Sequence, residues 1–232
     1  MSAAQVTGLR LDVSAGRNET QNIIEIERLA LQSGKLTVLS GPSGSGKSTL
    51  LYLLSGLLVP SAGAVVWDGL DLAGESESAR DKWRRLNAGF IFQNFQLVDE
   101  LGPVENVLMP AWFDHVSAKP WRDRAKLLLE KLGVPLNRKT VSLLSRGEQQ
   151  RVAVARALLF DPKVVFADEP TASLDGCTGR QVADILKDLA RNDGKTIIVA
   201  SHDPVLLGMA DEIIRIDRGC IIGADQIQAD AA

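Results

Sequence analysis

A glycine-rich turn between an apolar strand and a helix constrains this chain of 232 residues more than any other feature. Residues 36–40 form a short apolar run of the kind that a buried strand needs, and residues 48–54 follow with helical character. The turn fits the pattern G-x-x-x-x-G-K-[ST] and consists of Gly41, Pro42, Ser43, Gly44, Ser45, Gly46, Lys47 and Ser48. Glycines let several backbone N–H groups point at one anion, and the helix adds its positive N-terminal end. In this context the motif predicts a nucleoside-triphosphate site.

Three side chains in and beside the turn have predicted roles. Lys47 supplies a mobile cation for the β- and γ-phosphates of ATP, and the Ser48 hydroxyl can ligate Mg²⁺. Thr49 completes the predicted ATP-binding residues. The alternative is a chance glycine turn, but its constraints should coincide in only about one chain in a hundred of this size. The preceding strand and the following helix lower that chance further.

The rest of the chain alternates short apolar runs with helical patterns, which predicts a mostly parallel sheet covered by helices. Residues 164–167 and 196–200 have the length and composition of central parallel strands. The N-terminal segment alternates apolar and polar positions, which predicts an antiparallel sheet. Residues 94–156 are mostly helical in pattern. We therefore expect a single α/β domain over residues 1–232, with a P-loop NTPase core (1–93 and 157–232), an N-terminal antiparallel β subdomain and an inserted helical subdomain (94–156).

Composition excludes several classes of protein. Hydrophobic residues make up 45% and charged residues 24%, as in ordinary globular chains, and the net charge is −3. Nucleic-acid binders are usually basic, so no nucleic-acid partner is expected. Cys177 and Cys220 have no metal-ligand spacing, which favours a reduced compartment. No secretory signal is visible, and the longest apolar run, residues 50–59, is shorter than the roughly 20 residues of a membrane helix. We expect a cytoplasmic chain.

A second apolar strand ends in two carboxylates, Asp168 and Glu169. Residues at the C-terminal end of a strand face the ligand crevice of an α/β sheet. Asp168 suits Mg²⁺, directly or through water, and Glu169 suits the base that orients or deprotonates an attacking water. The alternative for this pair is a helix cap at the strand end.

Four further segments give the sequence a close resemblance to the ABC ATPase family. Residues 89–93 (GFIFQ) resemble its Q-loop, and residues 144–151 (LSRGEQQR) resemble its signature sequence. Residues 168–175 (DEPTASLD) resemble its Walker B segment running into the D-loop, and residues 201–203 (SHD) resemble the segment of its switch histidine. A lone Gln or His has little meaning, whereas five motifs in the family's order, counting the phosphate loop, are strong evidence.

The resemblance implies that two cassettes pair head to tail, with each ATP between the phosphate loop of one and the signature of the other. The signature residues that would face the partner's ATP are Ser145, Arg146, Gly147 and Glu148. They lie at the start of a predicted amphipathic helix, where N–H groups are available to a γ-phosphate. ATP would hold the dimer together, and loss of the γ-phosphate would release it.

The resemblance also implies roles for single side chains. Gln93 would contact Mg²⁺ or the water and couple the site to the helical subdomain, His202 would contact the γ-phosphate, and Asp175 would communicate across the dimer. The predicted catalytic residues are Glu169, His202, Gln93 and Lys47. The predicted metal ligands are Ser48, Gln93 and Asp168.

The resemblance further implies integral membrane permease subunits as partners, which would hold the chain at the inner face of the cell membrane. Residues 92–97 (FQNFQL) and 102–107 (GPVENV) resemble cassettes of the lipoprotein-release and macrolide-export type, with the cell-division cassette close behind. A soluble ABC protein of translation or DNA repair is an alternative, but such chains usually hold two cassettes. A regulatory cassette with little turnover is another. The presence of Lys47, Gln93, Glu169 and His202 argues against it.

Three features of the sequence need separate comment, and two of them leave alternatives open. Arg146 stands where the family usually has glycine, and it either projects into solvent, adds positive charge to the composite site or crowds dimer closure. Many members stack the base on an upstream aromatic residue, but none precedes Tyr52, and the aligned position is near Val13. We therefore predict weak base selection. The basic segment 80–85 is predicted to be a solvated helix face, or else a contact with anionic lipid or a membrane partner.

Overall fold

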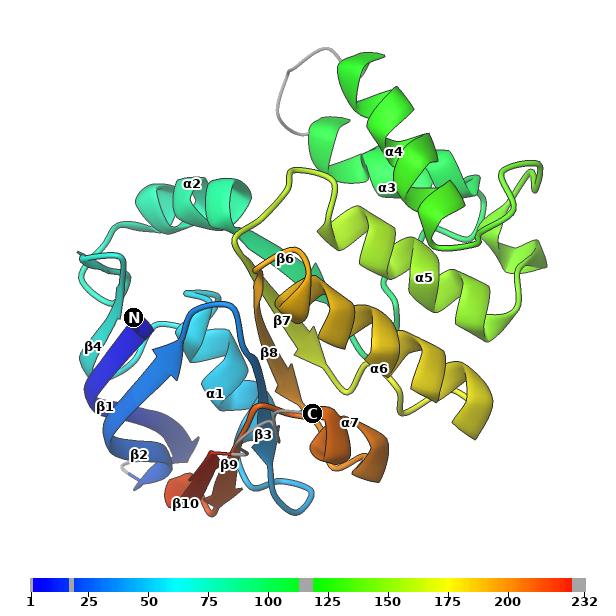
Figure 1. Ribbon diagram of the computed structural model, residues 1–232. Coiled ribbons are helices and arrows are strands. Elements are labelled where there is room, and N and C mark those ends of the chain that lie inside the picture. Colours follow the sequence, from blue (N-terminus) through cyan, green and yellow to red (C-terminus); the bar gives the residue numbers. More distant parts are fainter. Residues whose placement is uncertain (1, 17–18, 113–118, 227–232) are drawn as a thin grey trace.

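The computed structural model describes residues 2–16, 19–112 and 119–226 and contains two β-sheets covered by helices (Figure 1). The strands are β1 (Ser2–Gly16), β2 (Glu19–Gln32), β3 (Leu36–Ser40), β4 (Ala62–Trp67), β5 (Leu70–Asp71), β6 (Ala88–Ile91), β7 (Val164–Asp168), β8 (Thr196–Ala200), β9 (Glu212–Asp217) and β10 (Cys220–Gln226). The helices are α1 (Lys47–Leu54), α2 (Glu77–Asn87), α3 (Pro103–Trp112), α4 (Lys119–Lys131), the 3₁₀ turn η1 (Val141–Leu143), α5 (Arg146–Ala157), α6 (Gly176–Arg191) and α7 (Pro204–Met209).

The larger sheet has six strands in the order β10-β9-β3-β8-β7-β6, and it is parallel except for the antiparallel pair β9 and β10. Every residue of β3, β7 and β8 is buried, because helices or a second sheet cover both faces. The smaller sheet is antiparallel, in the order β2-β1-β4-β5. The predicted class, α/β with a mostly parallel sheet and an N-terminal antiparallel sheet, is confirmed.

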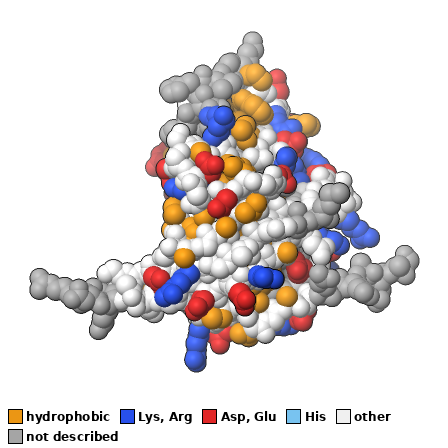
Figure 2. All heavy atoms as spheres, turned by 90° about the vertical axis from the view of Figure 1, so that its left-hand side faces the viewer, with side chains coloured by type: hydrophobic (Ala, Val, Ile, Leu, Met, Phe, Trp, Pro, Cys, Tyr) orange, Lys and Arg blue, Asp and Glu red, His pale blue; other side chains and the backbone are white. Residues whose placement is uncertain are grey.

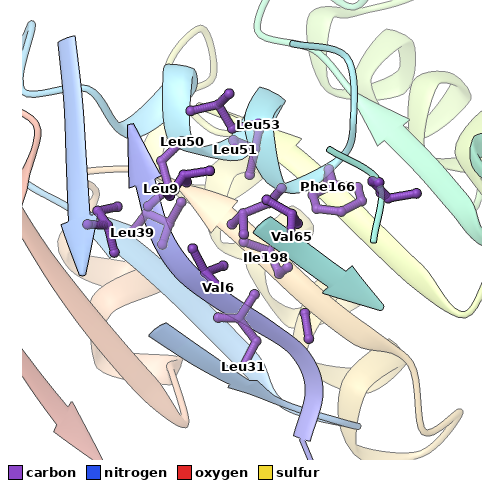
Figure 3. Packing of buried hydrophobic residues seen from close by; sticks show 14 of the residues in the cluster. Val6, Leu9, Leu31, Leu39, Leu50, Leu51, Leu53, Val65, Phe166 and Ile198 are labelled. Carbon is purple, nitrogen blue, oxygen red and sulfur yellow. The ribbon is translucent and has the colours of Figure 1, made fainter. Parts of the chain in front are cut away.

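The parallel sheet separates two apolar cores, because successive side chains of a strand point to opposite faces. Leu39, Phe166 and Ile198 belong to the core shared with α1 and the antiparallel sheet, and Figure 3 shows them spread across it. Val38 and Val165 belong to the opposite core, which α5, α6 and α7 complete. Helix α1 therefore lies between the two sheets, and the loop before it is fixed by packing on both sides.

A third apolar core lies among α3, α4 and α5. Trp121 of α4 meets Phe160 edge to face, with ring centroids 4.8 Å apart. Helix α5 belongs to two cores, because Val154 packs toward the sheet and Ala155 packs toward α3 and α4. The helical content predicted for residues 94–156 is confirmed, and the division of the chain at these boundaries stays a prediction.

The basic segment 80–85 differs from its prediction as a solvated face. It belongs to α2, and Arg80 is only 7% exposed, with its guanidinium donating to the Glu75 carbonyl and the Glu77 carboxylate. Trp83 packs on Trp67 of β4, with ring centroids 5.5 Å apart. The prediction is wrong for Arg80 and Trp83, because α2 turns this side toward the antiparallel sheet.

On the face that Figure 2 shows, acidic, basic and apolar side chains are mixed, without a large patch of one charge. Within the described ranges, no helix combines the length and the apolar composition that crossing a bilayer requires.

A buried carboxyl group at the start of β9 gives a pH-dependent contribution to stability. Glu212 is buried and accepts a 3.2 Å hydrogen bond from the Thr37 hydroxyl, and burial raises its pKa above the ordinary value for a glutamate. A raised pKa favours the folded chain at low pH, and that contribution is lost as the pH rises through the pKa of the folded state. We expect Glu212→Gln to raise the melting temperature by about 2 °C at pH 8 and by less near pH 4, as measured by calorimetry. An equal shift at both values would contradict the assignment.

Candidate active site

The phosphate loop follows β3 directly, and α1 begins at Lys47, one residue earlier than predicted. Gly41 passes so close to the neighbouring strand that a Cβ there would lie 2.1 Å from the Ile216 carbonyl oxygen. Gly46 has a φ of +104° at the N-cap of α1, a conformation that other residues rarely adopt. No side chain caps the first turn of α1, so its N–H groups are available to an anion.

Lys47 spans the loop from its base. Its ammonium donates 2.9 Å hydrogen bonds to the carbonyl oxygens of Gly41 and Pro42, and the residue is 7% exposed. These contacts hold the positive charge on the inside of the glycine-rich turn. A phosphate bound by the loop N–H groups would therefore meet a cation whose position is already set.

The carboxylate of Asp168 connects β7 to α1. Its Oδ1 accepts a 2.7 Å hydrogen bond from the Ser48 hydroxyl, and its Oδ2 accepts one of 2.7 Å from the Tyr52 hydroxyl. Burial, with the hydrogen bond and the charge of Asp168, raises the pKa of Tyr52 to about 12, so that the phenol remains a donor at neutral pH. Sequence reasoning missed Tyr52. The available signal was its place one helical turn after Ser48, on the same side of the helix.

Glu169 lies one residue beyond β7 and meets the predicted switch histidine. Its Oε1 is 2.9 Å from Nδ1 of His202, and its Oε2 accepts a 3.2 Å hydrogen bond from the hydroxyl of the buried Ser201. Its φ of +45° is unusual for a residue with a side chain, and its N–H donates to the Ala200 carbonyl at 2.8 Å. Backbone geometry of this kind often occurs where a side chain is held for a function. Sequence reasoning assigned no role to Ser201.

The residues present fit Mg²⁺, which prefers oxygen ligands and is usually held by one or two protein groups together with phosphates and water. The Ser48 hydroxyl and the Asp168 carboxylate already lie together beside the phosphate loop. Gln93 follows β6 and lines a cavity of about 240 Å³ with Asn94 and Arg146. Within the described part of the chain, no hydrogen bond joins Gln93 to Ser48 or Asp168, so its predicted role as a ligand stays a prediction.

The signature residues form the N-terminus of α5. Ser145 is its N-cap, and the Glu148 carboxylate accepts hydrogen bonds from the Ser145 N–H at 2.7 Å and the Ser145 hydroxyl at 2.9 Å. These hydrogen bonds hold the pKa of Glu148 below its usual range. Arg146 is exposed at the first helical position, on the wall of the cavity shared with Gln93.

The predicted D-loop residue Asp175 is the N-cap of α6. Its Oδ1 accepts from the N–H groups of Cys177 and Thr178, its Oδ2 accepts a 2.7 Å hydrogen bond from the Thr178 hydroxyl, and these bonds lower its pKa. Thr178 also touches the signature, because a Cβ on Gly147 would lie 2.2 Å from Thr178 Cγ2. The D-loop cap and the signature helix are thus in direct contact within one chain. Communication by Asp175 across a dimer stays a prediction.

No aromatic residue precedes the phosphate loop in the sequence, and the position aligned with the family's aromatic residue is near Val13. Val13 lies in β1 opposite Gln21, with its side chain 40% exposed. We expect ATP and GTP to bind with dissociation constants within a factor of about ten, because phosphate contacts carry most of the affinity. Competition titrations with both nucleotides check this, and a larger preference for ATP would contradict it.

Comparisons with known proteins agree with this geometry. Residues 25–172 match the family model described as ABC transporter. The chain is 43% identical over 218 residues to the "Uncharacterized ABC transporter ATP-binding protein YbbA" of Escherichia coli (strain K12), which covers 93% of this chain and 94% of that protein. It is 39% identical over 228 residues to the "Lipoprotein-releasing system ATP-binding protein LolD 1" of Chlorobium chlorochromatii (strain CaD3), covering 97% and 92%.

A solved structure is similar over nearly the whole chain. It is the dimeric, post-hydrolysis state of the ATP-binding cassette MJ0796 bound to ADP and Pi, with a TM-score of 0.88 and 32% sequence identity. The similarity covers 97% of this chain and 99% of that one.

Proposed function

Because this chain belongs to the ABC transporter family, whose cassettes bind and hydrolyse ATP, we propose that two copies close around two ATP molecules to drive separate membrane permease subunits. The observation that carries the proposal is the meeting of three motifs at the end of β7. There the Asp168 carboxylate contacts Ser48 at 2.7 Å, and the Glu169 carboxylate contacts His202 at 2.9 Å. The residues predicted to bind phosphate, to hold the metal and to act as the base thus lie beside one phosphate loop.

The residues divide the reaction among them. Ser48 and Asp168 would hold Mg²⁺, with Gln93 as the third predicted ligand. The metal would offset the negative charge of the transferred phosphate. Glu169 accepts the proton of the attacking water or orients that water. Lys47 and the loop N–H groups bind the β- and γ-phosphates, and the exposed ring of His202 contacts the γ-phosphate.

The second copy would complete each site. Ser145 and Gly147 lie at the start of α5, where backbone N–H groups and the helix dipole favour an anion. The dimeric form of the cassette MJ0796, bound to ADP and Pi, supports this arrangement. We infer that the γ-phosphate links the two copies and that its release separates them.

We propose that the permease binds at the β6 groove, a cavity of about 380 Å³ between α2, β6 and α3. Its lining includes Leu57, Arg84, Phe90, Phe92, Pro110 and Phe160. The groove is largely apolar, as protein contacts often are at their centre, and Phe92 immediately precedes Gln93. A partner seated there would act on the Q-loop directly. Bound to the permease, the chain would lie at the inner face of the membrane as a peripheral subunit.

The subfamily proposal is a cassette of the lipoprotein-release type, supported by the 39% identity to the relative named LolD 1. A regulatory cassette with little turnover is the second candidate, favoured by Arg146 at the signature and by the missing aromatic residue upstream of the phosphate loop. A soluble ABC protein outside transport is the third.

Two measurements separate these candidates, the identification of bound proteins and an assay of phosphate release. The Glu169→Gln chain is loaded with ATP in gently solubilised membranes of the native host, and the proteins that remain bound are identified. Recovery of a membrane permease supports the proposal, and a permease with a large extracytoplasmic domain supports the subfamily. Recovery of ribosomes or soluble proteins alone would overturn the transport assignment, and phosphate release by the unmodified chain excludes the regulatory reading.

A further inference from the structure

The carboxylate of Asp168 is held through both of its oxygens by hydroxyl groups from one helix. Ser48 and Tyr52 lie one turn apart on α1, and each donates a 2.7 Å hydrogen bond, Ser48 to Oδ1 and Tyr52 to Oδ2. A carboxylate with one donor can rotate about its Cβ–Cγ bond. With a donor on each oxygen, its plane is fixed relative to the helix.

The environment of Asp168 makes these donors important. The residue is 6% exposed, and within the residues that the structure describes no lysine, arginine or histidine forms an ion pair with it. A buried charge needs hydrogen bonds, an ion pair or a metal to offset the loss of water. The two hydroxyl groups supply the hydrogen bonds and leave the carboxylate without a protein cation.

Tyr52 is itself held in place. Its ring packs against the core beneath the antiparallel sheet, and its carbonyl oxygen accepts hydrogen bonds from the Ser55 hydroxyl and the N–H groups of Leu57 and Leu58. The phenol therefore reaches Asp168 from a rigid support rather than from a mobile side chain. The Ser48 hydroxyl, in contrast, belongs to the phosphate loop and would also ligate the metal.

We propose that Tyr52 is a positioning residue, which holds Oδ2 of Asp168 so that Oδ1 is presented to Ser48 and to Mg²⁺. The proposal rests on the proposed function, because it concerns the metal bound with ATP. It assigns Tyr52 no contact with nucleotide, so its hydroxyl should affect the use of Mg²⁺ and leave metal-free binding of ATP unchanged.

The test is a titration of a fluorescent ATP analogue, first with EDTA and then against free Mg²⁺. The Tyr52→Phe chain keeps the ring and loses the hydroxyl. We expect its affinity in EDTA to stay within about twofold of the original, and the free Mg²⁺ needed for half of the metal-dependent change to rise about tenfold, as for loss of one hydrogen bond to a charged group. Ser61→Ala is the control, since it removes a hydroxyl that hydrogen-bonds to the backbone of Asp12 and touches neither Tyr52 nor Asp168.

A second measurement uses the original chain. Tyr52 is the one tyrosine in the sequence, so ¹³C labelling at Cζ of tyrosine gives a single NMR signal. We expect it to shift when Mg²⁺ is added to the ATP complex, because the Asp168 carboxylate then shares its charge with the metal.

Three results would overturn the inference. One is an unchanged Mg²⁺ requirement in Tyr52→Phe, another is a parallel loss of affinity in EDTA, and the third is a signal insensitive to Mg²⁺. If the unmodified chain failed to bind ATP, the proposed function would be overturned and this inference with it. A failure of the inference alone looks different, because the unmodified chain then still binds ATP.

Discussion

A Glu169→Gln chain is expected to bind Mg·ATP, to hydrolyse it at less than about one hundredth of the original rate, and to accumulate as a dimer. The amide keeps the size of the side chain and can still contact Ser201 and His202, which lie 3.2 Å and 2.9 Å from the carboxylate. It cannot accept the proton of the attacking water, and the loss of a general base typically costs a factor of about 10² to 10⁴. Phosphate release and light scattering measure the two effects.

A matched substitution separates this effect from a general loss of charge. Glu130→Gln makes the same chemical change at an exposed position on α4, away from the phosphate loop, and should leave turnover and dimerisation unchanged. If Glu169→Gln kept more than a tenth of the original rate, Glu169 would not be the base, and the proton would have to reach another group.

The second large effect concerns the contact between the signature and α6. A Cβ on Gly147 would lie 2.2 Å from Thr178 Cγ2, closer than real side chains approach. Gly147→Ala must therefore either turn the Thr178 side chain, which breaks its hydrogen bond to Asp175, or displace the start of α5 or of α6. Both starts carry predicted site residues, Ser145 and Asp175. We expect at least a tenfold loss of ATP turnover, because in the proposed dimer Ser145 would face the partner's γ-phosphate and Asp175 would communicate across the interface.

A second substitution should restore much of that loss. Thr178→Ser removes the clashing methyl group and keeps the hydroxyl that donates to Asp175 Oδ2 at 2.7 Å. We expect the double variant Gly147→Ala with Thr178→Ser to return to within about threefold of the original rate, a non-additivity typical of residues in contact. Gly176→Ala is the control, since a Cβ there meets open space. A double variant as inactive as Gly147→Ala would show that the clash is not the cause.

Most of the fold followed from the sequence, because its signals are local. The apolar runs at residues 36–40 and 196–200 became β3 and β8 without change, and the glycine-rich turn fixed where α1 begins to within one residue. The inward side of α2 could not be predicted this way. Its sequence is strongly basic, and only the packing of Trp83 on Trp67 and the partners of Arg80 explain why charged residues face the protein.

The site was predictable in its residue types and less so in its contacts. The motifs predicted that Lys47, Asp168 and Glu169 lie together around the phosphate loop, and the structure shows Lys47 on the loop and Asp168 in contact with Ser48. The contacts that orient them come from residues far apart in the chain or outside the motifs, such as Ser201 beside Glu169 and Tyr52 beside Asp168. A single tyrosine in an apolar helix carries no sequence signal of its own until the end of β7 is placed opposite it.

Helix α1 connects the phosphate loop at one end to α2 at the other. The helix begins at Lys47, and an eight-residue helix is about 12 Å long. Just past its last turn, the Gly56 carbonyl accepts a hydrogen bond from Arg84 of α2, a residue that also lines the β6 groove. The helix therefore connects the β6 groove to the phosphate loop as one short rigid element. If the permease binds in the β6 groove as proposed, a displacement of Arg84 would reach the phosphate loop through α1 without involving Gln93. Replacing Gln93 should then weaken the coupling between permease and ATP site and leave part of it intact.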